Sequence, residues 1–291
     1  MTNELAALSN DLAAAVERAG KSVVAVHARP RFSSAGVIWR PGVIVTAEHT
    51  VREEEITVTL PNGTDRPVTL AGADAGTDIA VLKLAEPAGE VATLSSAELR
   101  PGYLALAIGR SENSGVNAAL GVISAISGSW RTWRGGRLDQ YIRLDLNMYP
   151  SSSGGAVIDA SGAVIGIATS ALSRIAGLAI PASTINRVTG EILSRGRVAR
   201  GYLGVGLQPV NVTDHQKGLI VLSVEHEGPA DNAGLLVGDI LVSLGGRAVS
   251  DTGDVQTALE SVSVGQAIEA ALVRGGAARQ VTITVGERRR D

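Results

Sequence analysis

The sequence predicts a mainly β protein with two antiparallel β-barrels, followed by a smaller α+β domain. Short runs rich in valine and isoleucine alternate with turn residues along most of the chain, and 35 glycines suit many tight turns. Apolar residues make up 45% of the 291 residues, but aromatic residues only 3%. A chain of this length forms about two domains, whose cores valine, isoleucine, leucine and alanine must fill.

The first element that the pattern predicts is a short amphipathic helix over residues 3–19. Leu5, Leu8, Leu12 and Val16 recur at helical spacing, which is typical of a helix with one apolar face. We treat residues 1–20 as a separate N-terminal segment and expect this helix to pack on the barrels.

The barrel strands are expected from residue 21 onward, in a unit that ends near residue 195. One apolar strand ends at His49, and Asn62-Gly63 joins two other runs, which is a strong hairpin signal. The remaining strands are expected at 22–26, 36–39, 56–60, 68–70, 80–84, 104–108, 119–124, 141–144, 156–158 and 164–168. A helix over 185–194 closes the unit.

A second, smaller domain is expected over residues 202–287, after a basic and glycine-containing linker at 196–201. Strand-like runs occur at 219–224, 239–244, 267–273 and 280–285. A short helix is expected after Gly228 and a second one over 253–261. This mixture of strands and short helices indicates an α+β fold.

The candidate nucleophile is Ser153, which two glycines follow directly at the start of an apolar run. A hydroxyl attacks well only with a base beside it and N–H donors for the oxyanion that it creates. His49, which ends one apolar strand, provides a base, and Asp78, which opens another, provides a carboxylate to orient it. The order His, Asp, Ser is that of the double-barrel serine proteases. Asp74 is the rival carboxylate, but its place in a turn favours capping.

Four segments together resemble the HtrA (Deg) family of serine proteases. They are Thr46–Val51 with its histidine, the run D-I-A-V-L-K from Asp78, the run S-G-G-A from Ser153, and G-Y-L-G-V at 201–205. The resemblance covers residues 21 to 286. It implies two six-stranded chymotrypsin-like barrels, one PDZ domain, and hydrolysis of unfolded or damaged proteins without a metal or an organic cofactor. It also implies a homo-oligomer, a trimer in this family, in which the N-terminal segment often takes part.

The sequence departs from the family where the oxyanion hole is expected. HtrA-like sequences usually have glycine two residues before the nucleophile, whereas this chain has Ser151 and then Ser152. We expect the backbone N–H groups of Ser151, Ser152 and Ser153 to form the hole. A non-glycine residue at positive φ costs roughly 1 kcal/mol or more. A weak enzyme, or an inactive scaffold that acts as a chaperone or adaptor, is therefore the alternative.

The residues expected to line the substrate pocket are neutral. In trypsin-like pockets the floor residue lies six positions before the nucleophile, which is Asn147 here. Met148, Ala168 and Ser170 are expected to lie near it. This set favours small or medium apolar side chains over lysine or arginine.

The segment Tyr202-Leu203-Gly204-Val205 resembles the carboxylate-binding loop of PDZ domains. Its N–H groups would hold a C-terminal carboxylate while the peptide adds as a strand to the sheet edge. Val255 and Leu259, four apart on the predicted helix, would line the pocket for the last side chain. A hairpin corner without a ligand is the alternative.

Other properties of the chain exclude several classes of function. A net charge of −3 argues against a nucleic-acid surface, there is no cysteine, and no His/Cys cluster predicts a metal site. No run of 18 apolar residues predicts a transmembrane segment. Glu4, Asp11 and Glu17 are unlike a secretory signal, so we expect a cytoplasmic protein; the alternative is an exported protein whose export segment was removed.

Overall fold

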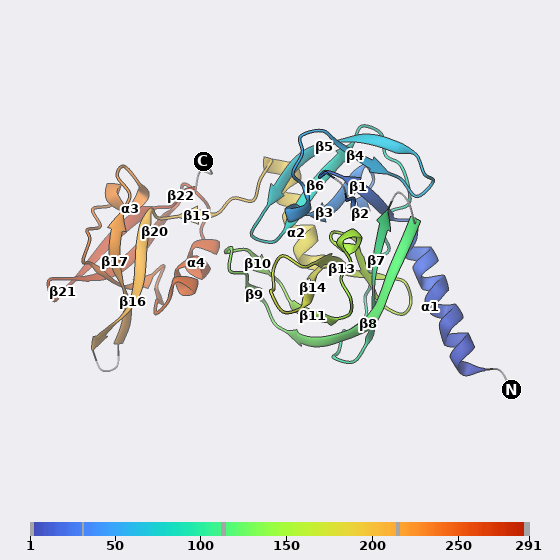
Figure 1. Ribbon diagram of the computed structural model, residues 1–291. Helices are drawn as coiled ribbons and strands as arrows, with labels where there is room; N and C mark the ends of the chain where they lie inside the picture. The colour runs from blue at the N-terminus through green and yellow to red at the C-terminus, as the bar shows by residue number, and fades with distance from the viewer. Residues whose placement is uncertain (1–2, 31, 112–114, 214–215, 288–291) are drawn as a thin grey trace. The chain divides into compact units, whose positions relative to one another are not determined.

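The computed structural model describes residues 3–30, 32–111, 115–213 and 216–287. The chain divides into two units, Met1–Val198 and Ala199–Asp291. The first unit contains two closed antiparallel barrels of six strands each, as the sequence predicts (Figure 1).

The first barrel has the strand order β1-β2-β3-β6-β5-β4. Its strands are β1 (Val23–His27), β2 (Ser34–Arg40), β3 (Val43–Ala47), β4 (Ile56–Thr59), β5 (Asp65–Asp74) and β6 (Ile79–Leu84). Val24, Ile38 and Leu82 are buried in its interior. Because strand side chains alternate between faces, the neighbouring residues of β2, β3 and β6 point outward and meet the second barrel.

The second barrel has the order β11-β14-β13-β12-β7-β8. Its strands are β7 (Leu104–Ser111), β8 (Gly115–Ser127), β11 (Tyr141–Asp145), β12 (Ala156–Ile158), β13 (Val164–Thr169) and β14 (Gly177–Pro181). A small hairpin, β9 (Trp130–Arg131) with β10 (Arg137–Leu138), extends between β8 and β11. The sequence analysis missed β14, because so short an apolar run is not distinguished by periodicity from the adjacent helix.

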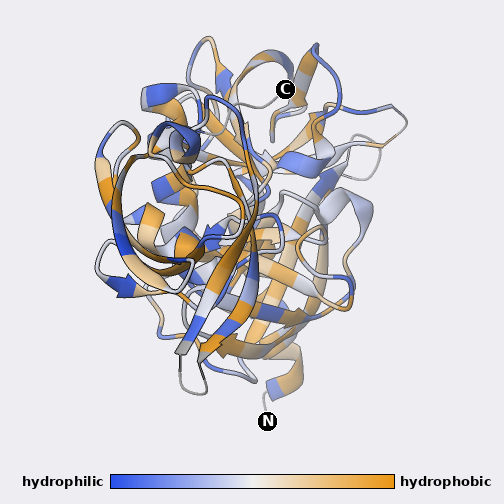
Figure 2. Ribbon diagram, turned by 90° about the vertical axis from the view of Figure 1, so that its left-hand side faces the viewer, coloured by the Kyte–Doolittle hydropathy of each residue, from blue (hydrophilic) through white to orange (hydrophobic). Residues whose placement is uncertain are grey.

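The two barrels share one continuous apolar core. Val37 and Ile79 from the first barrel pack with Ile108 and Ile167 from the second. Burial of this surface, at about 25 cal/mol per Å², is the main force that holds the barrels together. In Figure 2 the hydrophobic colour runs along the strands, as a valine- and isoleucine-filled core requires.

Two helices complete this unit. Helix α2 (Ala182–Arg195) packs its buried face on the shared core, and its C-cap is Gly196, which has a φ of 75°. Helix α1 (Glu4–Gly20) begins at the N-cap Asn3 and lies beside β7 (Figure 1). Its C-terminal half carries the buried Ala15 and Ala19, whereas residues 4–11 are exposed.

The second unit contains a sheet of order β16-β17-β18-β20-β21, with β16 (Val205–Thr213) at its edge. The other strands are β17 (Gln216–Val224), β18 (Ile240–Leu244), β20 (Ala267–Arg274) and β21 (Ala277–Thr284), with β19 (Arg247–Ala248) paired to β18. Two short strands, β15 (Gly201–Tyr202) and β22 (Gly286–Glu287), pair with each other. Helices α3 (Pro229–Asn232) and α4 (Thr252–Glu260) complete the α+β fold; β16 was not predicted as a strand.

Candidate active site

His49 lies in a short 3-10 helix, η1 (Glu48–Thr50), that begins where β3 ends. The Thr50 hydroxyl donates to the Ala47 carbonyl at 2.7 Å and fastens this turn. The His49 side chain is 18% exposed. A rigid strand therefore presents the imidazole at the end of the first barrel, partly open to solvent.

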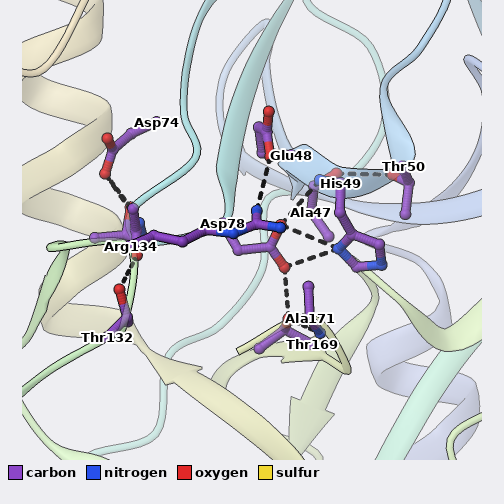
Figure 3. A network of polar contacts seen from close by, with 12 residues as sticks. Ala47, Glu48, His49, Thr50, Asp74, Asp78, Thr132, Arg134, Thr169 and Ala171 are labelled. Atoms are coloured by element: carbon purple, nitrogen blue, oxygen red, sulfur yellow. Dashed lines mark hydrogen bonds and ion pairs between the residues drawn. The ribbon is translucent and has the colours of Figure 1, made fainter. Parts of the chain in front are cut away.

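Asp78 is fully buried and holds His49 by three contacts (Figure 3). Its carboxylate accepts from the His49 backbone N–H at 2.9 Å, and Nδ1 of the ring lies 2.9 and 3.0 Å from its two oxygens. With Nδ1 bonded to the carboxylate, Nε2 is the ring nitrogen left for a reaction partner. Asp78 has a φ of 59°, a left-handed conformation that aspartate tolerates better than most residues.

Asp74 takes the capping role that the sequence predicted for it. Its Oδ2 accepts from the backbone N–H of Thr77 at 3.0 Å and from the Thr77 hydroxyl at 2.7 Å. These bonds close the turn that places Asp78 at the start of β6. Asp74 therefore shapes the loop, while Asp78 contacts His49.

Thr169 is a site residue that the sequence analysis missed. It ends β13, and its hydroxyl donates to Oδ2 of Asp78 at 2.5 Å (Figure 3). The neighbouring Ala168 and Ser170 were assigned to the substrate pocket, so the only available signal was a hydroxyl at the end of a fully apolar strand. Thr169 brings a second-barrel donor to a first-barrel carboxylate.

Ser153 lies against the end of the strand that leads to His49. Its carbonyl accepts from Ala35 N–H at 3.0 Å, and Gly154 N–H donates to the Ala168 carbonyl at 2.8 Å. Gly154 has a φ of 80°, and a Cβ there would lie 2.6 Å from the backbone nitrogen of Ala47. Only glycine allows this approach. Among the described residues the Ser153 hydroxyl makes no hydrogen bond to the His49 ring, and such bonds often tighten only when substrate binds.

The turn before Ser153 differs from the one expected. Residues Pro150–Ser152 form a 3-10 helix, η2, in which the Ser152 N–H donates to the Tyr149 carbonyl at 2.9 Å. The Ser152 N–H is therefore engaged within the turn and is not available as an oxyanion donor. Of the non-glycine residues described, only Asp78 and Glu227 have positive φ, so Ser151 does not carry the strain expected for it.

The hairpin β9–β10 of the second barrel also reaches this site. The Thr132 hydroxyl donates to the Gly76 carbonyl at 2.7 Å, two residues before Asp78. Arg134 forms an ion pair with Glu48 at 3.7 Å, next to His49 (Figure 3). The hairpin therefore contacts both segments that present the His49–Asp78 pair.

The four predicted pocket residues divide into two groups. Ala168 is buried in the interior cluster of the second barrel, and Met148 packs against the same cluster. Asn147 and Ser170 are exposed. Gly177 leaves space for Met148, since a Cβ at Gly177 would lie 2.7 Å from its Cγ.

In the second unit, the predicted carboxylate loop is bonded to its own domain through its carbonyls. The Leu203 carbonyl accepts from Ala230 N–H at 2.9 Å, and the Gly204 carbonyl accepts from Glu225 N–H at 2.8 Å. The Tyr202 hydroxyl bonds to the Glu225 carboxylate. Val205 begins the edge strand β16, and α4, with the buried Val255 and Leu259, packs near it.

Each of the two units matches a known protein family. Residues 34–167 match the trypsin-like peptidase domain family, and residues 201–285 match the PDZ domain family. A serine endoprotease from Yersinia pestis with a solved crystal structure is 30% identical, with a TM-score of 0.80, over 96% of this chain and 98% of that one. The HtrA-type protease AlgW, solved with a tripeptide, is 31% identical, with a TM-score of 0.77, over 96% of this chain and 98% of that one. The chain belongs to the HtrA-type family of serine proteases. The HtrA-type protease AlgW, solved with a decapeptide, is 29% identical, with a TM-score of 0.82, over 96% of this chain and 99% of that one.

Curated relatives correct the expected cellular location of this protein. A probable periplasmic DegP-like serine endoprotease of Brucella suis is 33% identical over 89% of this chain and 53% of the relative, so the chain spans about half of its length. One from Halomonas elongata is 32% identical over 89% of the chain and 57% of the relative. The expectation of a cytoplasmic protein is wrong: these names point outside the cytoplasm. The expectation failed because neither the lack of cysteine nor the acidic residues of the N-terminal helix depend on the compartment in which a protein works. Among the described helices, none is long and apolar enough to span a membrane.

Proposed function

We propose that this chain is a serine endopeptidase with Ser153 as nucleophile, His49 as general base and Asp78 as the carboxylate that orients the base. The observation that supports it most is the bond of His49 Nδ1 to the fully buried Asp78. This bond fixes the ring tautomer and leaves Nε2 to take the Ser153 proton. Gly154 packs closely against the backbone of Ala47, the last residue of β3, and this brings the neighbouring Ser153 toward the strand that leads to His49.

The reaction follows from these roles. As His49 removes its proton, the Ser153 oxygen attacks the peptide carbonyl and forms a tetrahedral oxyanion. The imidazolium, stabilised by Asp78, then protonates the leaving amine, and an acyl-enzyme remains. Water, deprotonated by His49, attacks the ester and regenerates Ser153. The N–H groups of Ser153 and Ser151 are the donors that would stabilise the oxyanion.

The proposed substrates are unfolded or damaged proteins, as in protein quality control. Met148 packs on an apolar cluster that includes Ala168, and no charged residue belongs to the predicted pocket. We therefore expect cleavage after small or medium apolar residues such as valine, alanine or leucine. Faster cleavage after arginine than after valine, in matched peptides, would contradict this preference.

The second unit is proposed to bind peptide C-termini. In a trans peptide the N–H points opposite to the carbonyl. Because the carbonyls of Leu203 and Gly204 are bonded within the domain, the N–H groups of Gly204 and Val205 point to the other side. The edge strand β16 is the place where a peptide would add. A peptide ending in a free carboxylate should bind, and its C-terminal amide should bind at least tenfold more weakly.

Helix α1 is proposed to take part in a homo-oligomer. Leu5 is 77% exposed and Leu8 is 45% exposed in the half of the helix that does not pack on the barrels. Replacing both by lysine should lower the sedimentation mass without unfolding the protein. An unchanged mass in the double variant would exclude this role.

A second candidate function is that of a protease-fold chaperone or adaptor with little activity. The engaged Ser152 N–H and the 3-10 turn before Ser153 favour it. Hydrolysis of unfolded casein by the wild type, compared with Ser153→Ala, separates the two candidates. Release of peptides only by the wild type supports the enzyme, whereas equal release from both favours the adaptor.

A further inference from the structure

The four residues Tyr149 to Ser152, here called the oxyanion turn, have the geometry of a type I turn. The Ser152 N–H donates to the Tyr149 carbonyl, and the central residues are helical. A type II turn closes with the same bond but has its central peptide flipped, and it needs positive φ at its third residue. That third residue is Ser151, which does not have positive φ.

The orientation of the central peptide decides which group faces the Ser153 N–H. In a 3-10 helix each carbonyl faces the N–H three residues further on, so the Pro150 carbonyl faces the Ser153 N–H. No peptide bond in the described chain is cis, and the Ser151 N–H therefore points the opposite way. A substrate oxyanion needs both N–H groups on one side. In the described orientation a carbonyl oxygen competes for that position instead.

Arg29 holds this carbonyl from the first barrel. It follows β1, and its Nη2 donates to the Pro150 carbonyl at 3.2 Å, while its Nε donates to the Phe32 carbonyl at 3.1 Å. A flip of the Pro150–Ser151 peptide would break the first of these bonds. The Ser151 hydroxyl adds a longer contact of 3.4 Å to Asn117 Oδ1.

We propose that Arg29 is a positioning residue, which holds the Pro150 carbonyl so that the Ser151 N–H stays out of the oxyanion hole and turnover is restrained. The inference rests on the proposed peptidase function. Ser151 acts in the same direction, because its Cβ disfavours the positive φ of the flipped turn, whereas glycine adopts it freely. Arg29 stabilises the unflipped peptide through its bond to the Pro150 carbonyl, and Ser151 disfavours the flipped one.

The test is a set of kinetic measurements on Arg29→Ala, Ser151→Gly and the double variant, with a short chromogenic peptide ester or amide as substrate. Removal of a charge-assisted hydrogen bond from one state should raise kcat about tenfold in Arg29→Ala, with KM unchanged. The double variant should exceed either single variant, and Arg29→Lys should remain close to wild type. Arg100→Ala, which removes an exposed arginine paired with Glu98, is the matched control and should change nothing.

A crystal structure of the double variant tests the same inference without activity. Residue 151 should have positive φ, and the 3-10 turn should be lost. A fall in kcat in Arg29→Ala, or an unchanged turn in the double variant, would overturn the role of Arg29. If no variant hydrolyses peptide above Ser153→Ala, the proposed function fails, and the turn seen in the crystal still decides the inference.

Discussion

The hydroxyl of Thr169 donates a 2.5 Å hydrogen bond to the carboxylate of Asp78, across from the second barrel to the first. Asp78 already accepts two kinds of donor from His49, the backbone N–H and ring Nδ1. A buried carboxylate needs such donors, since burying an unpaired charge costs several kcal/mol. Thr169 therefore helps to hold Asp78 in place beside His49.

Replacing Thr169 by valine should lower kcat about tenfold, because a hydrogen bond to a charged group is worth about 1.5 kcal/mol or more. KM should change little, because the Thr169 hydroxyl donates to Asp78 and valine keeps the shape of the threonine side chain. Steady-state kinetics with a peptide substrate measure both constants. Thr189→Val is the matched control, because the buried Thr189 hydroxyl has no hydrogen-bond partner in the described structure. Equal kcat values for Thr169→Val and wild type would contradict the account.

Replacing Gly136 by alanine should disturb the contact between the β9–β10 hairpin and the turn before Asp78. A Cβ at Gly136 would lie 2.1 Å from the carbonyl carbon of Gly76 and 2.6 Å from the backbone nitrogen of Thr77. Since backbone atoms must move, we expect a loss of about 1–3 kcal/mol in the free energy of unfolding, together with lower kcat. Gly128→Ala, in the approach to the same hairpin, meets nothing within 4 Å and should leave both quantities unchanged. Thermal unfolding and steady-state kinetics on the two variants measure both quantities. Equal values for Gly136→Ala and Gly128→Ala would contradict the prediction.

The sequence predicted those site residues whose side-chain type is unusual at the boundary of an apolar strand. His49 and Asp78 each interrupt an apolar strand end, and their contact in the structure follows the roles expected for them. Thr169 could not be singled out, because a threonine that ends a strand is common and its partner is distant in sequence. The catalytic roles themselves remain predictions.

The conformation before Ser153 was not predictable from the family pattern. The loss of glycine at position 151 indicated strain, but the chain avoids strain by adopting a different turn. Turn type depends on small energy differences and on tertiary contacts such as the bond from Arg29. The barrels were predicted more securely because their alternating pattern is repeated over many strands.

The second unit should lose stability in acid through one carboxylate. The bidentate hydrogen bonds from Arg274, at 2.7 Å each, hold the pKa of Asp239 below its usual range, although burial opposes them. A lowered folded pKa gives stability that is present above the unfolded pKa, about 3.9, and is lost as pH falls through the folded pKa. The free energy of unfolding of the second unit should therefore be about 2 kcal/mol lower in Asp239→Asn than in the wild type at neutral pH. This difference should shrink below about pH 4.

Hydrogen exchange of peptides from β18 and β20 measures this effect in the full chain. Glu269→Gln, an exposed change on β20, is the control and should exchange like wild type. The loss of stability in Asp239→Asn, relative to the wild type, could instead stay constant from neutral pH to well below the unfolded pKa. That result would show that the charge of the Asp239 carboxylate is not what stabilises the second unit.

The most direct test of the central claim is the reaction of the folded protein with a fluorophosphonate probe, followed by peptide mapping. The account predicts one adduct, on the Ser153 oxygen, which is absent from Ser153→Ala and forms much more slowly in His49→Ala. A well-folded wild type that gives no adduct, or an adduct on another residue, would contradict it.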